Sequence, residues 1–368
     1  MLPAAWYSGG MKRALVVLGV VLLGLTAWLL LAPTPVDPVA WEPTPDAGFT
    51  GEFAPNDDLA GMEVVPLPSG HGPEDVDVDA QGRIYAGLQD GRVLRWDAPD
   101  AEPEVFVDTG GRPLGLHWDA EGNLLIADAF KGLLSVSPDG AIRTLLTEVD
   151  GEPMVFTNDL EITRDGVIYV SDASTRFDQH RWKLDIFENR PSGRLIAYDT
   201  RTGEAEVVLP KMYFANGVAI DPEERFVLIN ETSRYRVRRL WLSGPDAGTD
   251  EVLVDNLPGF PDGISAGTGG RFWLAIPGPR NAFLDQTAGA PLLRKIATRL
   301  PSSLHPKPER YGHVVALDGD GRVRCSLQHP SGEAFAVITS AQERDGWLYL
   351  GSLSEPAFAR IPVPDRCR

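Results

Sequence analysis

The chain is poor in cysteine and in positive charge. Its 368 residues include 2 Cys, and 34 Lys and Arg stand against 52 Asp and Glu, so the net charge is −18. Two cysteines are too few for a disulfide scaffold, and the sequence holds no CxxC metal-binding motif. The negative charge argues against nucleic acid as a partner, because phosphate groups require Lys and Arg. The composition instead fits a soluble domain that tolerates or recruits cations.

Methionine is also scarce, whereas residues that interrupt regular structure are abundant. The chain has 5 Met against 38 Gly and 31 Pro, which favours many short strands joined by turns over a helical bundle. Both cysteines, Cys325 and Cys367, lie near the C-terminus. They either pair and tie the chain end to the last repeat or remain free thiols, and the sequence leaves both alternatives open.

One long segment without charge lies near the N-terminus. Residues 14–32 contain no charged side chain, and as a helix they would extend roughly 28 Å, about the thickness of a bilayer core. Lys12 and Arg13 precede the segment and acidic residues follow it, so residues 1–13 are predicted to be cytoplasmic and the rest extracytoplasmic. A cleaved signal peptide is the alternative, but its apolar region is normally shorter and Pro33 would follow the cut. We therefore expect a single-pass membrane anchor.

A segment rich in proline, aspartate and alanine follows the anchor over residues 33–60. Such a composition is typical of a semi-rigid spacer between a membrane and a folded domain. The remaining residues, 61–368, form the domain whose function has to be inferred.

A repeat runs through this domain. The segment DVDVDAQGRIYAGLQDGRVLRWD reads as strand, turn, strand, turn and strand, and the same pattern recurs five more times. Most copies are separated by the spacing of four-stranded propeller blades. We expect an all-β, six-bladed β-propeller over residues 61–368, closed by a strand from the N-terminal side. The equivalent positions in the second strands are Tyr85, Leu125, Tyr169, Val227, Trp273 and Tyr349.

Two insertions, residues 176–193 and 280–310, interrupt the repeat. Both follow second strands, so they are expected to cover the same mouth of the propeller. Within the second insertion, PLLRKIATRLPSSL has helical apolar spacing with interleaved basic residues. It predicts a helix that packs on the rim, acts as a lid or contacts the membrane surface.

Acidic and amide side chains stand where the innermost strands begin. Four of the six starts carry them, and Asn or Asp before a strand can also cap a turn. Glu74 could likewise pair with an arginine. Four such residues in register, without His or Cys, favour a hard divalent cation, and a wide ring of protein oxygens favours Ca²⁺ over Mg²⁺. The starts are Glu74, Leu114, Asn158, Asn216, Asp262 and a stretch near Phe335.

These segments resemble a known superfamily. GPEDV, TNDLEI, FANGVAI and PDGIS are similar to the calcium-dependent six-bladed propellers that include senescence marker protein/gluconolactonases, paraoxonases and diisopropyl-fluorophosphatase. GRPLGL, GRLIAYD and DGWLYLGSL, together with the anchor, resemble its strictosidine synthase-like branch, to which adipocyte plasma membrane-associated protein belongs. The resemblance implies that the metal ligands are Glu74, Asn158, Asn216 and Asp262.

The chain departs from these relatives at three positions. Gluconolactonase-like members carry a sugar-binding Asn at the second or third strand start, whereas Leu114 predicts an apolar pocket wall. Paraoxonases place a proposed catalytic His nearby, and the nearest histidine, His117, either packs or faces the pocket. Strictosidine synthases use a glutamate in the last blade, whose nearest counterpart is Glu333.

The sequence thus predicts a calcium-dependent hydrolase that acts on a small apolar ester or lactone. Asp262 and Asp159 are the candidate nucleophile and bases, and Asp75 is a candidate for orienting a metal ligand. Two other functions stay open. A non-catalytic binding protein would hold a structural Ca²⁺, and a strictosidine synthase-type condensing enzyme would depend on Glu333.

Overall fold

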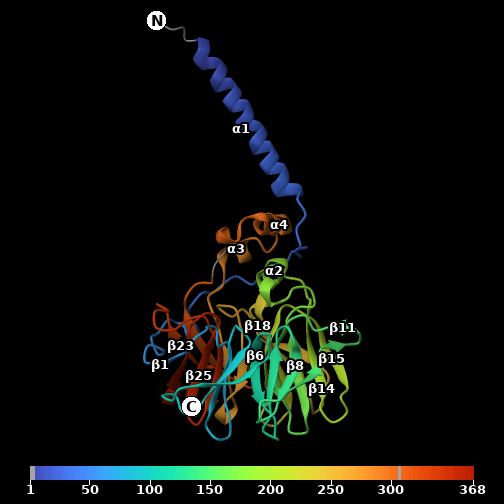
Figure 1. The fold of residues 1–368 in the computed structure, drawn as a ribbon, viewed down its shortest axis with the longest axis vertical. Coiled ribbons are helices and arrows are strands. Elements are labelled where there is room, and N and C mark those ends of the chain that lie inside the picture. Colours follow the sequence, from blue (N-terminus) through green and yellow to red (C-terminus); the bar gives the residue numbers. More distant parts are fainter. Residues whose placement is uncertain (1–4, 306–307) are drawn as a thin grey trace.

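Six four-stranded antiparallel sheets surround one axis in the computed structural model, which describes residues 5–305 and 308–368 (Figure 1). The predicted six-bladed propeller is confirmed. Within a blade, each strand pairs with the next one in the chain, and the first strand is the innermost. All six second-strand positions predicted from the sequence lie in second strands, because an apolar strand between tight turns can bury its side chains only between neighbouring blades.

The strands of each blade follow the chain from the axis outward, except that the outer strand of the last blade is β1. The inner strands are β2 (Val76–Val78), β6 (Pro113–Trp118), β12 (Thr157–Ile162), β16 (Ala215–Ile220), β20 (Ile264–Ala266) and β24 (Ile338–Arg344). The second strands are β3 (Ile84–Gly87), β7 (Leu124–Asp128), β13 (Val167–Asp172), β17 (Phe226–Glu231), β21 (Arg271–Ala275) and β25 (Trp347–Ser352). The third strands are β4 (Arg92–Trp96), β8 (Gly132–Val136), β14 (Gly193–Asp199), β18 (Arg236–Trp241), β22 (Gly312–Asp318) and β26 (Ala357–Pro362). The outer strands are β5 (Glu104–Asp108), β9 (Ile142–Leu146), β15 (Ala205–Met212), β19 (Asp250–Val254), β23 (Val323–His329) and β1 (Glu63–Pro66).

The ring is closed by strands from opposite ends of the chain. β1 pairs antiparallel with β26, so the outer strand of the last blade comes from the N-terminal side, as predicted. Arg360 pairs with Glu63 at 2.7 Å across this junction. The closure removes the free edges that an open stack of blades would leave.

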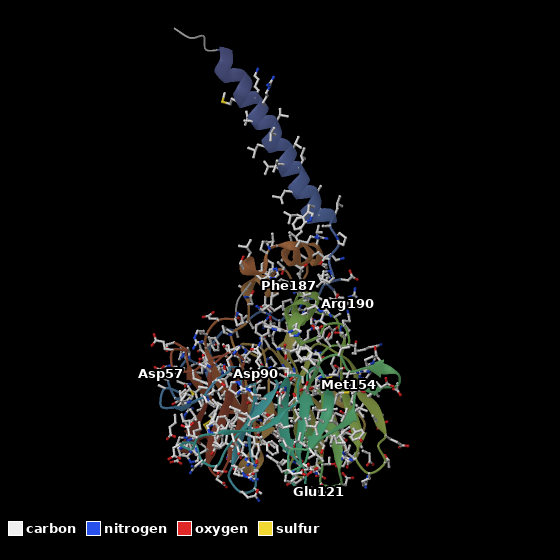
Figure 2. The ribbon with its side chains drawn as sticks, in the orientation of Figure 1. Asp57, Asp90, Glu121, Met154, Phe187 and Arg190 are labelled. Carbon is white, nitrogen blue, oxygen red and sulfur yellow. A yellow bond between two sulfur atoms is a disulfide. The ribbon has the colours of Figure 1, made fainter. Side chains whose placement is uncertain are left out.

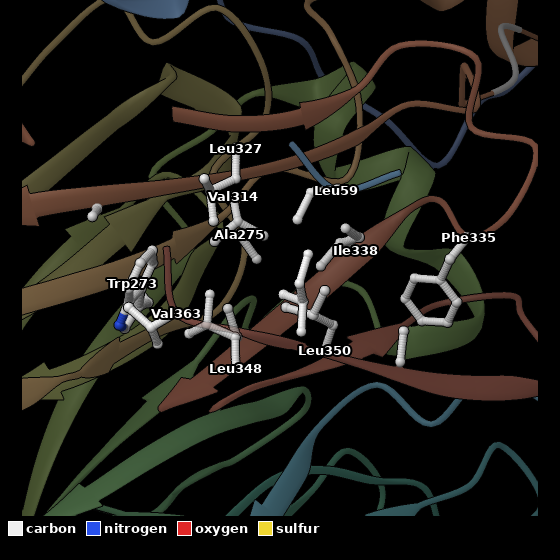
Figure 3. Close-up of a cluster of buried hydrophobic side chains, with 14 of the residues drawn as sticks. Leu59, Trp273, Ala275, Val314, Leu327, Phe335, Ile338, Leu348, Leu350 and Val363 are labelled. Carbon is white, nitrogen blue, oxygen red and sulfur yellow. The ribbon is translucent and has the colours of Figure 1, made fainter. Parts of the chain in front are cut away.

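The apolar core lies between adjacent blades. Between the fifth and sixth blades, Trp273, Leu327 and Leu348 are fully buried against Leu59, which the N-terminal segment contributes (Figure 3). Each large apolar side chain removed from water in this way stabilises the fold by about 1.5–3 kcal/mol. The sixth blade is therefore secured by packing as well as by strand pairing.

The N-terminal helix α1 (Ala5–Leu31) projects from one end of the propeller (Figure 1). Its stretch Gly10–Leu31 is apolar and long enough to cross a membrane, and its most apolar window is not buried against the rest of the protein. The helix begins before the predicted anchor at residue 14. The segment after it does not behave as a detached spacer. The Val39 N–H donates to the Glu188 carbonyl and the Trp41 N–H to the Ala288 carbonyl, each at 3.1 Å.

Both insertions fold into helices at the end of the propeller that faces α1 (Figure 1). This confirms the prediction that they cover one mouth, and α2 and α4 are in contact. The first insertion forms η2 (Gln179–Arg181) and α2 (Trp182–Glu188), and the second forms α3 (Ala282–Gln286), α4 (Pro291–Arg299) and η5 (Ser302–Leu304). The other short elements are η1 (Gly51–Phe53), β10 (Glu148–Val149), β11 (Glu152–Pro153), η3 (Thr232–Arg234), η4 (Thr268–Gly270) and η6 (Asp365–Cys367).

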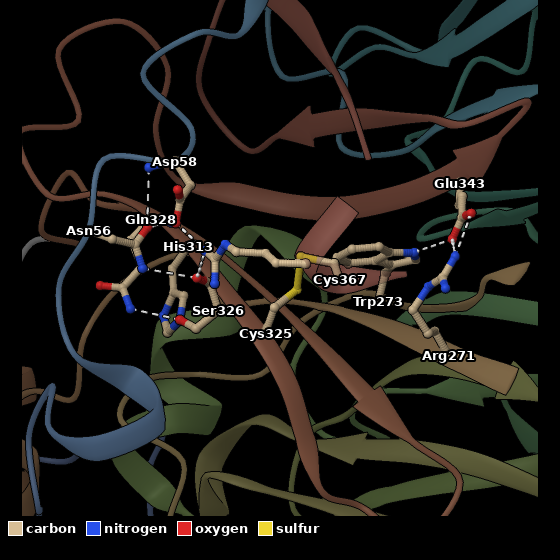
Figure 4. The surroundings of a disulfide bond; sticks show 11 residues. Asn56, Asp58, Arg271, Trp273, His313, Cys325, Ser326, Gln328, Glu343 and Cys367 are labelled. Carbon is tan, nitrogen blue, oxygen red and sulfur yellow. Dashed lines mark hydrogen bonds and ion pairs between the residues drawn. A yellow bond between two sulfur atoms is a disulfide. The ribbon is translucent and has the colours of Figure 1, made fainter. Parts of the chain in front are cut away.

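Cys325 and Cys367 form a disulfide, which settles the alternative that the sequence left open. The bond joins β23 to η6, and both cysteines are buried beside Trp273 (Figure 4). The C-terminus is thereby attached to the fifth blade, next to the junction where the ring closes.

We predict that replacing both cysteines, by Cys325→Ser with Cys367→Ser, lowers the free energy of unfolding by about 2–4 kcal/mol, because the bond restricts the unfolded chain over a separation of 42 residues. Urea unfolding without reductant measures the change. The wild-type chain under reducing conditions is the matched control and should lose a similar amount. An unchanged unfolding midpoint in the double variant would contradict the prediction.

Candidate active site

The four predicted metal ligands meet at one end of the central tunnel. Glu74, Asn158, Asn216 and Asp262 all line a cavity of about 190 Å³, and all four also line a narrower pocket beneath it. The cavity lies at the helix-covered end of the propeller, where Phe187 is found, whereas Glu121 marks the opposite end (Figure 2). The structure therefore brings together side chains from blades 1, 3, 4 and 5.

Bulges in the inner strands present these side chains to the cavity. The pairing register shifts between Thr157 and Leu160 and again between Ala215 and Val218, and these breaks contain Asn158 and Asn216. A bulge bends a strand and re-aims a side chain. Glu74 precedes β2 and Asp262 precedes β20, so both lie just before the inner strands of their blades. The register breaks explain why equivalent positions in different blades converge.

The start of the sixth inner strand differs from the prediction. Thr339, rather than a residue near Phe335, occupies the equivalent position, since its carbonyl accepts the Gly263 N–H at 2.8 Å. Its hydroxyl donates to the Glu74 carbonyl at 2.7 Å. Phe335 is instead fully buried in the apolar core near Ile338 (Figure 3). Because its side chain is apolar, Phe335 packs in the core instead of facing the tunnel.

The carboxyl groups of Glu74 and Asp262 at the cavity floor are partly buried, and the negative charge of Glu74 acts on Asp262. Burial raises the pKa of Glu74, although the positive charge of Arg112 opposes the shift. Burial also raises the pKa of Asp262 well above its usual range, and the negative charge of Glu74 adds to the effect. Arg112 is buried and lies 3.4 Å from Glu74, which is the arginine pairing that the sequence left open. One arginine thus pairs with Glu74, and the raised pKa values show that both carboxyl groups hold their protons more tightly than usual when no cation is present.

The Asn216 side chain is oriented by its neighbours. Its amide nitrogen donates to the Thr232 hydroxyl at 3.0 Å and hydrogen-bonds to Asp262. The Thr232 hydroxyl in turn donates to the Pro261 carbonyl at 2.7 Å, so it can only accept from Asn216. The carboxamide oxygen is thus the atom of Asn216 left to bind a cation or a substrate.

The donor set fits a hard cation. Asn158 is buried, and its carboxamide makes no hydrogen bond within residues 5–305 and 308–368. In that same part of the chain, no three Asp, Glu, His or Cys side chains group into a metal site by themselves. The carboxamide oxygens of Asn158 and Asn216 would therefore have to complete a site built on Glu74 and Asp262. Oxygen ligands of this kind, two of them charged, suit Ca²⁺.

The walls of the cavity are largely apolar, although Lys183, Arg280 and Glu309 also line it. Leu114 lines it as predicted, together with Phe156 and Phe214, whose rings meet edge to face 5.5 Å apart. Phe214 and the β-branched Val337 adopt left-handed backbone conformations, with φ of 57° and 54°. Such conformations cost on the order of 1–3 kcal/mol each and tend to occur at functional sites. Both strained residues line this cavity.

Asp159 and Asp75 lie in the narrow pocket beneath the four ligands. Asp159 accepts the Leu160 N–H at 2.9 Å and the Val218 N–H at 2.8 Å. Asp75 similarly accepts the Val76 N–H at 2.8 Å and the Leu116 N–H at 2.9 Å. Each carboxylate therefore bridges its own inner strand to that of another blade.

Two residues assigned to the pocket from the sequence lie elsewhere. His117 is not among the residues that line the cavity; it pairs with Glu161 at 2.7 Å and faces Asp77 at 4.0 Å. Burial alone would lower the pKa of His117. The negative charges of Glu161 and Asp77 outweigh this effect and raise the pKa to about 9. Glu333 is exposed in a turn and does not line the cavity, because the last inner strand begins further along the chain.

Sequence reasoning missed two residues that act on the ligands. Arg112 neutralises part of the charge on Glu74, and its position two residues before Leu114 was the available signal. Thr232 orients Asn216 from the end of the second strand, and no pattern in the sequence identifies it. Contacts of this kind depend on the turn between two strands.

We predict that the chain without bound metal becomes less stable as the pH rises from about 5 to 8. Glu74 and Asp262 have raised pKa values, so the folded state holds their protons above the pH at which the unfolded chain loses them. Their contribution to stability is present below pH 4 to 5 and is lost as the pH passes through the raised values, by about 1.4 kcal/mol for each pKa unit.

Urea unfolding at about pH 5 and pH 8, in the presence of chelator, measures this loss of stability. Glu74→Gln removes one of the two carboxyl groups and should give a flatter dependence on pH. A stability that rises with pH in the wild-type chain would show that these carboxyl groups do not govern the response.

Sequence comparisons find relatives over most of the chain. The strictosidine synthase family profile matches residues 158–245, and that of the strictosidine synthase-like N-terminal region matches residues 51–96. Adipocyte plasma membrane-associated protein from Rattus norvegicus is 34% identical over 357 residues, covering 91% of this chain and 95% of its own. Protein strictosidine synthase-like 10 from Arabidopsis thaliana is 35% identical over 345 residues, covering 83% and 91%.

Solved structures share the fold at much lower identity. A gluconolactonase from Xanthomonas campestris superposes with a TM-score of 0.60 at 15% identity, over 82% of this chain and 90% of its own. A calcium-binding regucalcin from Agrobacterium tumefaciens gives a TM-score of 0.57 at 14% identity, over 82% and 93%. These likenesses show a common propeller fold. By the identity and coverage of its sequence relatives, the chain belongs to the strictosidine synthase-like family.

Proposed function

We propose that this protein is a membrane-held, calcium-dependent hydrolase of an apolar ester or lactone. The proposal is carried by one observation: two carboxylates and two carboxamides converge on the floor of a cavity whose walls are largely apolar. Two solved propellers of the same fold, a gluconolactonase and a calcium-binding protein, support the same class of chemistry.

Glu74, Asn158, Asn216 and Asp262 would hold the ion. A Ca²⁺ bound there supplies positive charge that polarises a carbonyl and stabilises the oxyanion that develops on it. The chain itself contributes the arrangement of the ligands, which the bulges in β12 and β16 and the Thr232 hydroxyl fix in place. It also contributes an apolar enclosure that excludes water from the reacting group.

Of the two candidate bases, the contacts favour Asp262. Its carboxyl group faces the cavity, and burial together with the charge of Glu74 raises its pKa well above the usual range, so it takes up a proton more readily than an ordinary aspartate. The two oxygens of Asp159 already accept backbone N–H groups from two blades. Moving Asp159 to take up a proton would break the contact to Val218, so we assign it a positioning role.

The apolar wall selects the substrate. Where sugar-binding members of the superfamily place a carboxamide, Leu114 offers no hydrogen bond, and Phe156 and Phe214 extend the same surface. A sugar lactone would leave its hydroxyl groups without partners against these side chains, at a cost of about 1–3 kcal/mol for each group. An ester or lactone with an alkyl or aryl portion avoids this cost.

The extracytoplasmic placement of the propeller is part of the proposal. Lys12 and Arg13 precede the apolar stretch of α1, which favours a cytoplasmic N-terminus. The Cys325–Cys367 disulfide is in keeping with an oxidising compartment on the far side of the membrane.

Hydrolysis of aryl esters and lactones by the full chain in detergent tests the proposal. We expect chelator to lower kcat/KM roughly 100-fold and Ca²⁺ to restore it, with a similar loss in Glu74→Gln. Glu333→Gln is the control and should retain activity, because Glu333 lies outside the cavity.

Other outcomes of this experiment identify the alternatives. A Ca²⁺-dependent rise in Tm without any hydrolysis would indicate a binding protein with a structural ion. Activity that ignores chelator but is lost in Glu333→Gln would indicate a condensing enzyme. A Tm that does not respond to Ca²⁺ would exclude the ion site itself.

A second prediction concerns the hydroxyl that orients Asn216. Thr232→Val keeps the shape of the side chain but removes both hydrogen bonds, and we expect about a tenfold loss of Ca²⁺ affinity by calorimetry. Thr232→Ser retains the hydroxyl and should bind Ca²⁺ nearly as the wild type does. Equal affinities in the two variants would show that Thr232 does not orient the ligand.

A further inference from the structure

The helical cap over the cavity exposes large apolar side chains on its outer face. Phe283 of α3, Leu292 and Leu293 of α4 and Leu304 of η5 are 37%, 53%, 50% and 66% exposed. We call these four residues the apolar cap face. Apolar groups gathered in this way on a soluble surface usually mark a site of contact with a membrane or another molecule.

The basic side chains of α4 are already used within the protein. Arg294 is buried and donates to the Leu284 carbonyl at 2.9 Å, and Lys295 pairs with Asp37 at 2.9 Å. Arg299 donates to the carbonyls of Leu29 and Ala32. They are therefore engaged by internal partners, and leucines remain as the outward groups at the start of this helix. The composition of α4 alone suggested a basic surface, but its contacts leave an apolar one.

The same contacts hold the apolar cap face beside the end of the membrane helix. Arg299 donates to the carbonyls of Leu29 and Ala32 at 2.6 and 2.8 Å, which caps the C-terminal end of α1. The hydroxyls of Thr34 and Thr298 lie 2.9 Å apart in the next contact along the chain. A helix that crosses a bilayer over Gly10–Leu31 ends at the lipid–water boundary, so α4 is held at that depth (Figure 1).

An apolar route leads from this face into the cavity. On α3, Phe283 is partly exposed whereas the next residue, Leu284, lines the cavity. The ring of Phe187, which also lines the cavity, lies 6.3 Å from that of Phe283 (Figure 2). The outside of the cap and the interior of the cavity are thus joined by adjacent aromatic and aliphatic side chains.

We propose that the apolar cap face is embedded in the surface of the bilayer that α1 spans, so that the cavity receives its substrate from the lipid phase. Delivery of the substrate from the lipid phase rests on the proposed hydrolase function, whereas the docking of the cap does not. The contact is apolar, through Phe283, Leu292, Leu293 and Leu304, and does not depend on anionic headgroups. The substrate is then an ester or lactone that partitions into membranes.

Fluorescence quenching in vesicles tests the docking with the full chain. A single cysteine introduced as Leu292→Cys is labelled with an environment-sensitive dye, while the native cysteines are protected as a buried disulfide. We expect a blue-shifted emission that loses roughly half its intensity when the lipids carry a nitroxide near the headgroup end of the acyl chain. Phosphatidylcholine vesicles suffice, because no anionic lipid is required.

Two control positions define the background. Val105→Cys is matched in exposure, since Val105 is 53% exposed on the outer strand β5. Glu121→Cys places the dye at the opposite end of the propeller (Figure 2). Quenching at position 292 that is no greater than at these positions would overturn the proposal. Raising the salt from about 0.1 to 1 M should leave the quenching at 292 unchanged, and a loss would show an electrostatic contact instead.

The route of the substrate is tested separately. Leu292→Asn with Leu293→Asn should raise KM about tenfold for a long-chain aryl ester held in vesicles, while kcat/KM for a short, water-soluble ester stays unchanged. Val105→Asn with Val252→Asn, which changes two exposed valines on the outer strands β5 and β19, is the matched control. Equal losses for both esters would overturn delivery from the lipid. No hydrolysis of either ester would reject the proposed function, and the quenching result would still decide the docking.

Discussion

The acidic side chains gathered where the inner strands begin are the constraint on which the rest of the structure depends. Asp75 and Asp159 use their carboxylates to bind backbone N–H groups of other blades, so part of this charge holds the ring together. Glu74, which pairs with the buried Arg112, and Asp262 face the cavity, and both have raised pKa values. Carboxylates in such a place are expensive unless a proton or a cation accompanies them. The same feature therefore secures the fold and favours a proton or a cation at the cavity floor.

The polarity of the protein changes along the axis of the propeller. At the cavity floor the side chains are acids and amides, the walls are mostly leucine and phenylalanine, and the cap exposes leucines beside the end of α1. The arginines and the lysine of α4 do not interrupt this gradient, because they bond to carbonyls and to Asp37. An apolar compound moving inward would meet the polar floor only at its reacting group. This order of environments is suited to binding an ester or lactone in one orientation.

Sequence reasoning succeeded where the pattern spans only a few neighbouring residues and failed where it depends on contacts between blades. The second strands were located correctly at all six positions, since alternating apolar residues between turns need no knowledge of distant contacts. The last blade was misjudged around Phe335 and Glu333, because a bulge between Ile338 and Ser340 sets the start of its inner strand. His117 was placed near the pocket, yet its pairing with Glu161 of another blade holds it further down the tunnel. Registers and partners of this kind appear only when the blades are assembled.

The sequence by itself determined the number of blades, the apolar helix that precedes them and the residue types available at each strand start. The periodicity and composition that indicate these features extend over a few residues, so they can be recognised without a structure. The tertiary structure decided which of those residues share a cavity, that Arg112 and Thr232 act on Glu74 and Asn216, and that residues 36–59 lie against the propeller. It also decided that the charges of α4 point to internal partners. These outcomes depend on contacts between segments far apart in the chain, which no local pattern records.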